Sequence, residues 1–253
     1  MPNHITNIIT STDMEKLKSL LLNEKDEVDF NKIIPMPKDL EITAGSCDYG
    51  ESTYFPDSPK KAKLRQAIDL VFASCYDDTI SRDEFVKKVM RKRKVKSLIC
   101  ELKDLDKDDK EHLFGYIAGY FNLKRYGSIN WYEWCNKNWG TKWNGYDCFV
   151  GDDYIQFDTA WSTPKPLLLE LSKQVDVTVA YADEDVFGEN AGIVYYENGI
   201  AERRDIDNLI AFGCAVKGVS ADDYGYDESD EFCVKQEDID KAQDLLDSIF
   251  KLN

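Results

Sequence analysis

The sequence predicts an α+β fold, in which helices cover one face of an antiparallel sheet. Segments that alternate apolar and polar residues recur near both ends of the chain, as expected for strands that bury one face. Segments with apolar residues at helical spacing separate them. With 253 residues, 43% of them hydrophobic, the chain is long enough to bury a sizeable core. We therefore expect a single α+β domain over residues 1–253.

The N-terminal part of the chain predicts a β-α-β unit. Residues 4–10 alternate apolar and polar side chains and favour a strand. Thr12 and Glu15 have the spacing of a capping box and predict the start of a helix. A second strand is expected at 28–34, where prolines stop it.

A loop and a helical insertion are expected at 38–125. Three helices follow the loop. The first is expected at 59–76, the second begins after the capping residue Ser81, and the third ends at Asn122. The second of these helices continues into a basic block at 87–96. Such a run is typical of a solvated helix face, and contact with a phosphate group is the alternative.

The strands resume in the C-terminal half. A strand at 154–161 precedes a helix and a further strand at 177–181. A hairpin is expected at 191–204, because Asn198-Gly199 is a strong signal for a type I′ turn. This order of elements predicts a ferredoxin-like antiparallel sheet. An acidic extension at 206–253 follows and ends in a helix.

The composition argues against several kinds of site and partner. The formal net charge is −16, and a field of that sign disfavours direct nucleic-acid binding. The seven cysteines form no CxxC pair, and His4 and His112 are the two histidines. We therefore expect no metal site built on Cys or His, no cofactor and no catalytic residues of the Cys–His or Ser–His kind. An Asp/Glu site around Asp158, with Asp147, Asp183 and Glu184 as neighbours, is the alternative to the expectation of no metal and no catalytic residues. The chain shows neither a signal peptide nor a membrane-spanning run, which predicts a cytoplasmic protein.

All five tryptophans lie between residues 131 and 161, in a stretch that also contains Asn and Lys. Such a cluster is either the centre of a core or the wall of a pocket. In a core, Asp158 and Lys142 would belong to a structural hydrogen-bond network, and Phe157 and Trp161 would share the buried side of their strand. In a pocket, the same stretch would bind a small ligand or a nucleobase. The candidate ligand-binding residues are Asn138, Lys142, Trp143, Asp158 and Trp161.

A dense acidic segment lies near the C-terminus, where carboxylates are interleaved with tyrosines. Carboxylates along a loop can take the places of phosphates in the basic groove of a partner, and such association weakens with salt. A flexible, solvated loop is the alternative. The residues expected to bind a partner are Asp222, Asp223, Tyr224, Tyr226, Asp227, Glu228, Asp230 and Glu231.

Several segments resemble a known family. They are Met1-Pro-Asn-His-Ile-Thr-Asn7, Lys32-Ile-Ile-Pro-Met-Pro37, Tyr126-Gly-Ser-Ile-Asn-Trp-Tyr-Glu-Trp134, Asn138-Trp-Gly-Thr-Lys-Trp143 and Phe157-Asp-Thr-Ala-Trp-Ser-Thr-Pro164. Together they resemble the YubB-type ferredoxin-like domain family of phages and plasmids, a domain of unknown function. The resemblance covers residues 1–37 and 126–205. It implies a ferredoxin-like fold without an iron–sulfur cluster, and an origin in a mobile element.

Charge and implied origin together predict an accessory protein of a phage or mobile element that binds and inhibits a host protein. The partner is expected to have a basic surface, as a defence nuclease or a nucleic-acid-binding complex would. The alternative is a small-ligand or nucleotide-binding protein, conceivably an enzyme, that uses the Trp/Asn/Lys/Asp pocket. A structural protein without a dedicated partner surface is a third hypothesis.

Overall fold

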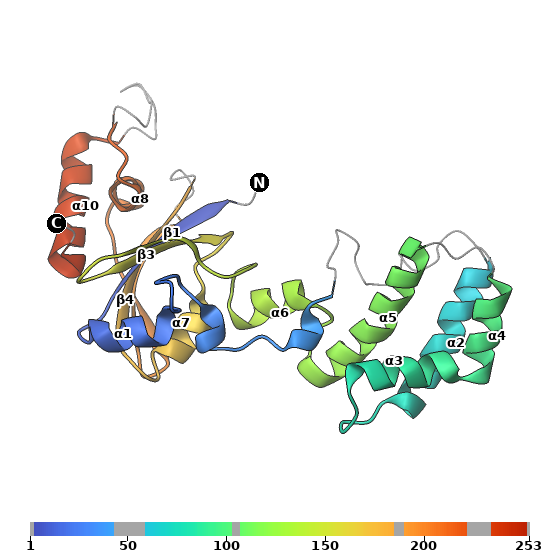
Figure 1. Cartoon of the computed structure of the whole chain (residues 1–253). Helices are drawn as coiled ribbons and strands as arrows, with labels where there is room; N and C mark the ends of the chain where they lie inside the picture. The colour runs from blue at the N-terminus through green and yellow to red at the C-terminus, as the bar shows by residue number, and fades with distance from the viewer. Residues whose placement is uncertain (1–2, 43–58, 103–106, 185–189, 222–233, 252–253) are drawn as a thin grey trace. The chain divides into compact units, whose positions relative to one another are not determined.

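The computed structural model describes residues 3–42, 59–102, 107–184, 190–221 and 234–251. The chain divides into two compact units (Figure 1). The first, which we call the sheet unit, contains Met1–Pro35 and Cys135–Asn253. The second, the helical unit, contains Met36–Trp134.

A six-stranded antiparallel sheet forms the centre of the sheet unit, with the strand order β2-β3-β1-β4-β5-β6. The N-terminal strand β1 therefore lies between two strands from the C-terminal half of the chain. This arrangement confirms the predicted α+β class and the antiparallel sheet. The strands are β1 (His4–Thr10), β2 (Tyr146–Val150), β3 (Ile155–Ala160), β4 (Val177–Asp183), β5 (Ala191–Glu197) and β6 (Ile200–Arg204).

Helices cover both faces of this sheet (Figure 1). Those described in the sheet unit include α1 (Met14–Leu21), the 3-10 helix η1 (Phe30–Lys32), α7 (Lys165–Leu171), α8 (Leu209–Lys217) and α10 (Gln236–Phe250). On the face of α1 and α7, the ring of Phe30 packs edge-on against Phe157. On the opposite face, Ile8 and Ala180 share a core with Phe212 of α8 and Leu246 of α10.

The second helical layer differs from the prediction of helices on one face. The predicted layer corresponds to α1 and α7. No helix was predicted at the position of α8. Residues 206–253, expected as an acidic extension, supply α8 and α10 to the core of the sheet unit. In the described part of α10, Glu237, Asp240 and Asp244 are exposed.

Residues 28–34 do not form the predicted second strand. Val28 makes a single isolated bridge to Leu22, and η1 follows. The side chain of Asp29 accepts a hydrogen bond from the backbone N–H of Asn31 at 3.0 Å. An aspartate that satisfies nearby backbone donors favours a turn over strand pairing, which explains the difference.

The helical unit contains the predicted helices at 59–76 and after Ser81. Ser81 and Glu84 form a reciprocal capping box, as the sequence suggested for Ser81. A core of aromatic and aliphatic side chains, including Phe72, Phe85 and Phe121, joins the helices. The elements are η2 (Lys38–Leu40), α2 (Pro59–Cys75), α3 (Arg82–Arg91), α4 (Arg93–Glu101) and α5 (Lys107–Tyr126), and α6 (Trp131–Asn138) follows them. None of the helices in the described ranges is both long and apolar enough to span a membrane.

Candidate functional site

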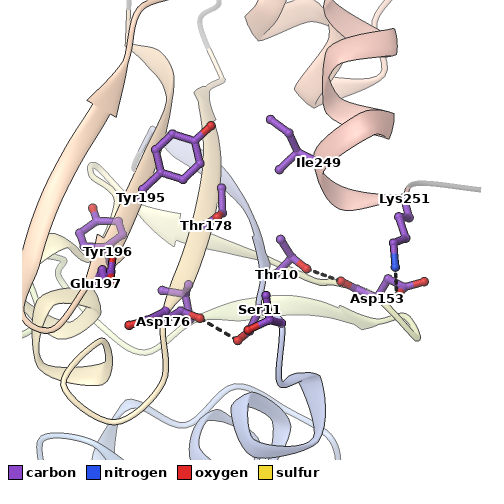
Figure 2. Close-up of a pocket in the computed structure, with 12 residues that line it drawn as sticks. Thr10, Ser11, Asp153, Asp176, Thr178, Tyr195, Tyr196, Glu197, Ile249 and Lys251 are labelled. Carbon is purple, nitrogen blue, oxygen red and sulfur yellow. Dashed lines mark hydrogen bonds and ion pairs between the residues drawn. The ribbon is translucent and has the colours of Figure 1, made fainter.

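A pocket of about 380 Å³ lies at the end of the sheet where β1 and β5 finish and β4 begins (Figure 2). Ile249 and Lys251, at the C-terminal end of α10, form one wall, and Asp153 comes from the turn between β2 and β3. A volume of this size is typical of small-molecule and side-chain binding sites. The segments that line it are far apart in the sequence, so only the fold brings them together.

The strand register places three hydroxyl groups in a row across the pocket. Thr10 pairs with Thr178, and Thr178 pairs with Tyr195. Directly paired residues point to the same face of a sheet, so all three side chains lie on the face covered by α10. The hydroxyl of Tyr195 accepts a hydrogen bond from Arg204 at 3.3 Å. Because Tyr195 is 36% exposed, its ring is accessible to a bound group.

Hydrogen bonds fix the loops around the pocket. Thr10 Oγ1 donates to the backbone carbonyl of Asp153 at 2.6 Å, and Ser11 Oγ donates to that of Asp176 at 2.7 Å. The same Ser11 oxygen accepts from the backbone N–H of Asp13 at 3.1 Å. Lys251 Nζ lies 3.3 Å from Asp153 Oδ1 and ties α10 to the β2–β3 turn. The pocket is therefore formed before any ligand arrives.

Carboxylates dominate the charge of the pocket. Lys251 pairs with Asp153, which leaves Asp176 and Glu197, both exposed, among the lining residues. Within the described residues, neither of these two carboxylates forms an ion pair. Burial raises the pKa of Tyr196, so this lining residue stays neutral. Two carboxylates, several hydroxyls and an accessible aromatic ring suit an ammonium or guanidinium group.

Asp158, the central residue of the predicted ligand pocket, belongs to a polar network on the α8 side of the sheet. Thr6 Oγ1 donates to Asp158 Oδ1 at 2.8 Å, and Lys217 Nζ donates to the same Thr6 oxygen at 3.1 Å. Next to them, the hydroxyl of Tyr146 lies 2.7 Å from His4 Nδ1. Burial, with smaller effects from nearby carboxylates including Asp158, raises the pKa of Tyr146 to about 12. This network resembles the structural alternative considered for Asp158.

The tryptophans divide between core and surface. Trp139 is 4% exposed, and its Nε1 donates to the backbone carbonyl of Ile34 at 2.9 Å. Phe157 is fully buried as predicted, whereas Trp161 is 55% exposed. The prediction that Trp161 shares the buried side was wrong, because β3 ends at Ala160 and Trp161 adopts a φ of +71°. A change of backbone conformation ends the alternation of a strand.

The remaining predicted site residues are separate from the pocket in Figure 2. Lys142 Nζ lies 4.2 Å from the centre of the Trp143 ring, a cation–π contact, and Asn138 ends α6. None of the five candidate ligand-binding residues lines this pocket. The predicted partner-binding residues, Asp222 to Glu231, lie outside the described residues. In the part of the chain that is described, no cluster of three or more His, Cys, Asp or Glu could hold a metal ion.

Comparison with protein families matches a family model to residues 138–211, described as the ferredoxin-like domain in Api92-like protein. The sheet unit thus contains a ferredoxin-like domain. The match includes Asp176 and Glu197 of the pocket. It agrees with the ferredoxin-like fold implied by the resemblance, under a different family description.

One solved structure is also similar, the crystal structure of protein api92 from Yersinia pseudotuberculosis. The two chains are 12% identical with a TM-score of 0.36, over 82% of this chain and 100% of the other. Values this low carry no argument about fold or function. Comparison with curated proteins found no match.

Proposed function

We propose that this protein binds a partner with a basic surface through its sheet unit. The distribution of charge carries the proposal. The sheet unit holds 31 Asp and Glu against 14 Lys and Arg, whereas the helical unit holds 17 against 18. The acidic excess of the whole chain therefore belongs to the sheet unit alone. A field of this kind accelerates association with a basic partner and selects against acidic ones.

The pocket in Figure 2 gives this acidic unit a point of attachment. A lysine or arginine side chain of the partner would place its cation near Asp176 and Glu197 and its stem along the ring of Tyr195. The row of hydroxyls from Thr10 to Tyr195 offers further acceptors. Long-range attraction and a specific anchor are the two components that a selective interface needs.

Helix α10 extends the acidic surface away from the pocket. Its inner face packs against α8 and the sheet through Ile239, Leu246 and Phe250. Its outer face exposes Glu237, Asp240 and Asp244 among other carboxylates. A basic partner anchored in the pocket would thus meet further carboxylates along the helix.

The resemblance to the YubB-type family supports a finer proposal. The chain would be an accessory protein of a phage or other mobile element, and it would inhibit a host protein in the host cytoplasm. Partners that bind nucleic acid have the required basic grooves. The acidic segment at 222–231 would add carboxylates to the same interface.

A pull-down from host lysate at low and at moderate salt, with quantitative mass spectrometry, tests the proposal. The wild-type chain is compared with Asp176→Asn/Glu197→Gln. The matched control, Glu24→Gln/Glu27→Gln, removes the same charge from exposed positions that do not line the pocket. We expect one stoichiometric basic partner that is released as salt rises, and about tenfold less of it with the pocket variant only.

Two results would contradict the proposal in different ways. Equal capture by the pocket variant and the control would exclude the pocket as the anchor and leave only the general acidic field. An eluate without a stoichiometric partner at both salt concentrations would reject the partner-binding function itself.

A further inference from the structure

The helical unit carries a basic surface that the acidic sheet unit does not share. Residues 87–96 of α3 and α4 include seven Lys and Arg and no Asp or Glu. Val89 and Val95 of this block are fully buried in the helical core. The seven cations are on the solvent side, where each is exposed or half-exposed.

A cavity lies within this surface, between the end of α2 and the junction of α3 with α4. It measures about 390 Å³. Its lining is three cations, one hydroxyl and one thiol, without a carboxylate: Lys88, Arg91, Lys92, Ser74 and Cys75. Cys75 is only 3% exposed. A site of this composition suits a phosphate group.

Within the described residues, these cations keep their charge available for a ligand. In the described residues, none of the seven forms an ion pair. Lys88 interacts electrostatically with Asp77, whose pKa is lowered mainly by hydrogen bonds from the backbone N–H and hydroxyl of Thr79. Lys88 contributes only a smaller part of that shift.

Three of the cations oppose the dipole of their own helix. Arg93, Lys94 and Lys96 lie in the first turn of α4, which contains no acid, and its N-cap Lys92 makes no side-chain capping hydrogen bond. Positive charge at the N-terminal end of a helix is unfavourable. By contrast, α3 begins with Asp83 and Glu84 in its first turn. A bound anion at the start of α4 would relieve this repulsion.

We propose that this surface binds the phosphodiester backbone of a nucleic acid, with one phosphate in the cavity at Lys88, Arg91 and Lys92. A single small phosphate would leave Arg93, Lys94 and Lys96 without an anion, whereas a polymer engages cations both inside and outside the cavity. The net charge of −16 argues against such binding when it is averaged over both units of the chain. Because the acidic excess lies in the other unit, the repulsion acts on the helical unit only at long range, and salt screens it.

Fluorescence anisotropy of the full-length protein with labelled duplex DNA and with single-stranded RNA tests the proposal over a series of salt concentrations. We expect log K to fall linearly with log salt. Lys88→Gln/Arg91→Gln/Lys92→Gln should reduce that slope by about 2–3 and affinity by about tenfold or more. The matched control, Lys107→Gln/Lys110→Gln/Lys124→Gln, removes equal charge from α5 and should change affinity less than about threefold.

A second variant separates loss of binding from loss of folding. Arg93→Gln/Lys94→Gln/Lys96→Gln removes charges that oppose the α4 dipole, so its melting temperature should equal or exceed that of the wild type while its affinity falls. The proposal is overturned if neither nucleic acid binds at low salt, or if the cavity variant and the α5 control lose affinity equally. Displacement of the nucleic acid by millimolar inorganic phosphate at constant ionic strength would also overturn it, in favour of a small phosphorylated ligand.

Discussion

At the scale of single residues, Gly140 shows how the tryptophan-rich stretch connects to α7. Its φ is +85°, and a Cβ at this position would lie 2.4 Å from Cδ of Pro166. Both the backbone conformation and the space therefore require glycine. Gly218, the C-cap of α8, has a φ of +65°, but a Cβ added there would meet no atom within 4 Å.

We expect Gly140→Ala to lower the free energy of unfolding by about 2–5 kcal/mol, from strain plus overpacking. Gly218→Ala should cost only about 1–2 kcal/mol, because strain alone acts there. Urea denaturation followed by circular dichroism measures both. Equal losses for the two variants would mean that Pro166 moves aside at little cost.

Individual tryptophans also show the limit of inference from residue type. Trp139 is a core residue whose indole N–H has a backbone partner, as a buried tryptophan requires. If the alternation of β3 continued, Trp161 would be on the buried side of the strand. It lies beyond the last residue of β3, however, and is exposed. The alternation of apolar and polar residues predicts that a strand is present, but it does not show the residue at which the backbone leaves the strand conformation.

At the scale of elements, the start of α1 differs from the capping box expected at Thr12. The side chain of Asp13 accepts the hydrogen bond from the backbone N–H of Lys16 at 3.0 Å, and Asp13 is the N-cap. The prediction chose the wrong one of two adjacent capping residues. Both residue types can accept a hydrogen bond from the first turn, so residue type alone does not distinguish them.

Asp13→Ala should therefore lower the free energy of unfolding by about 1 kcal/mol. Thr12→Ala should change it by less than about 0.5 kcal/mol, because Thr12 is exposed and is not the N-cap. Chemical denaturation of the two variants in parallel is the measurement. A larger loss for Thr12→Ala would make Thr12 the capping residue in solution.

The elements that the sequence predicted are those with a clear period or a distinctive turn. The hairpin of β5 and β6 was confirmed because Asn198 and Gly199 both adopt positive φ, as a type I′ turn requires. Helix α8 was missed because Leu209–Lys217 is apolar on nearly every side, so it has no amphipathic period to detect. Strand β2 was missed because Tyr146–Val150 is short and lies on the edge of the sheet.

At the scale of the whole molecule, charge separates along the division into two units. The acidic excess of the sheet unit produces self-repulsion that opposes folding. Raising NaCl from about 0.01 M to about 0.1 M shortens the Debye length from about 30 Å to about 10 Å. We expect the melting temperature to rise by about 2–4 °C, equivalent to about 1 kcal/mol.

Thermal melts followed by circular dichroism at the two salt concentrations check this expectation. Glu24→Gln/Glu27→Gln, with less repulsion to screen, should gain less from the added salt. A melting temperature that falls with salt would show that ion pairs, such as Lys251–Asp153, outweigh the repulsion.

The pocket is the feature that sequence analysis could not have found. Its residues come from the ends of β1, β5 and α10, the start of β4 and one turn. Local patterns place a residue on a strand or helix, but they do not give the order of strands in a sheet. The functional candidates visible in the sequence were instead dense local clusters, one aromatic and one acidic.

The chain leaves the sheet unit and returns to it at two points that are joined within that unit. The hydrogen bond from Trp139 Nε1 to the carbonyl of Ile34 connects the segment before the helical unit with the segment after it. Such a closed base favours exchange of the helical unit, because the two ends of the insertion stay together without it. Replacement of Met36–Trp134 would change about a hundred residues and would leave all residues of the strands in the chain, but the boundary after Trp134 lies inside α6, so an engineered linker has to replace or keep this helix whole.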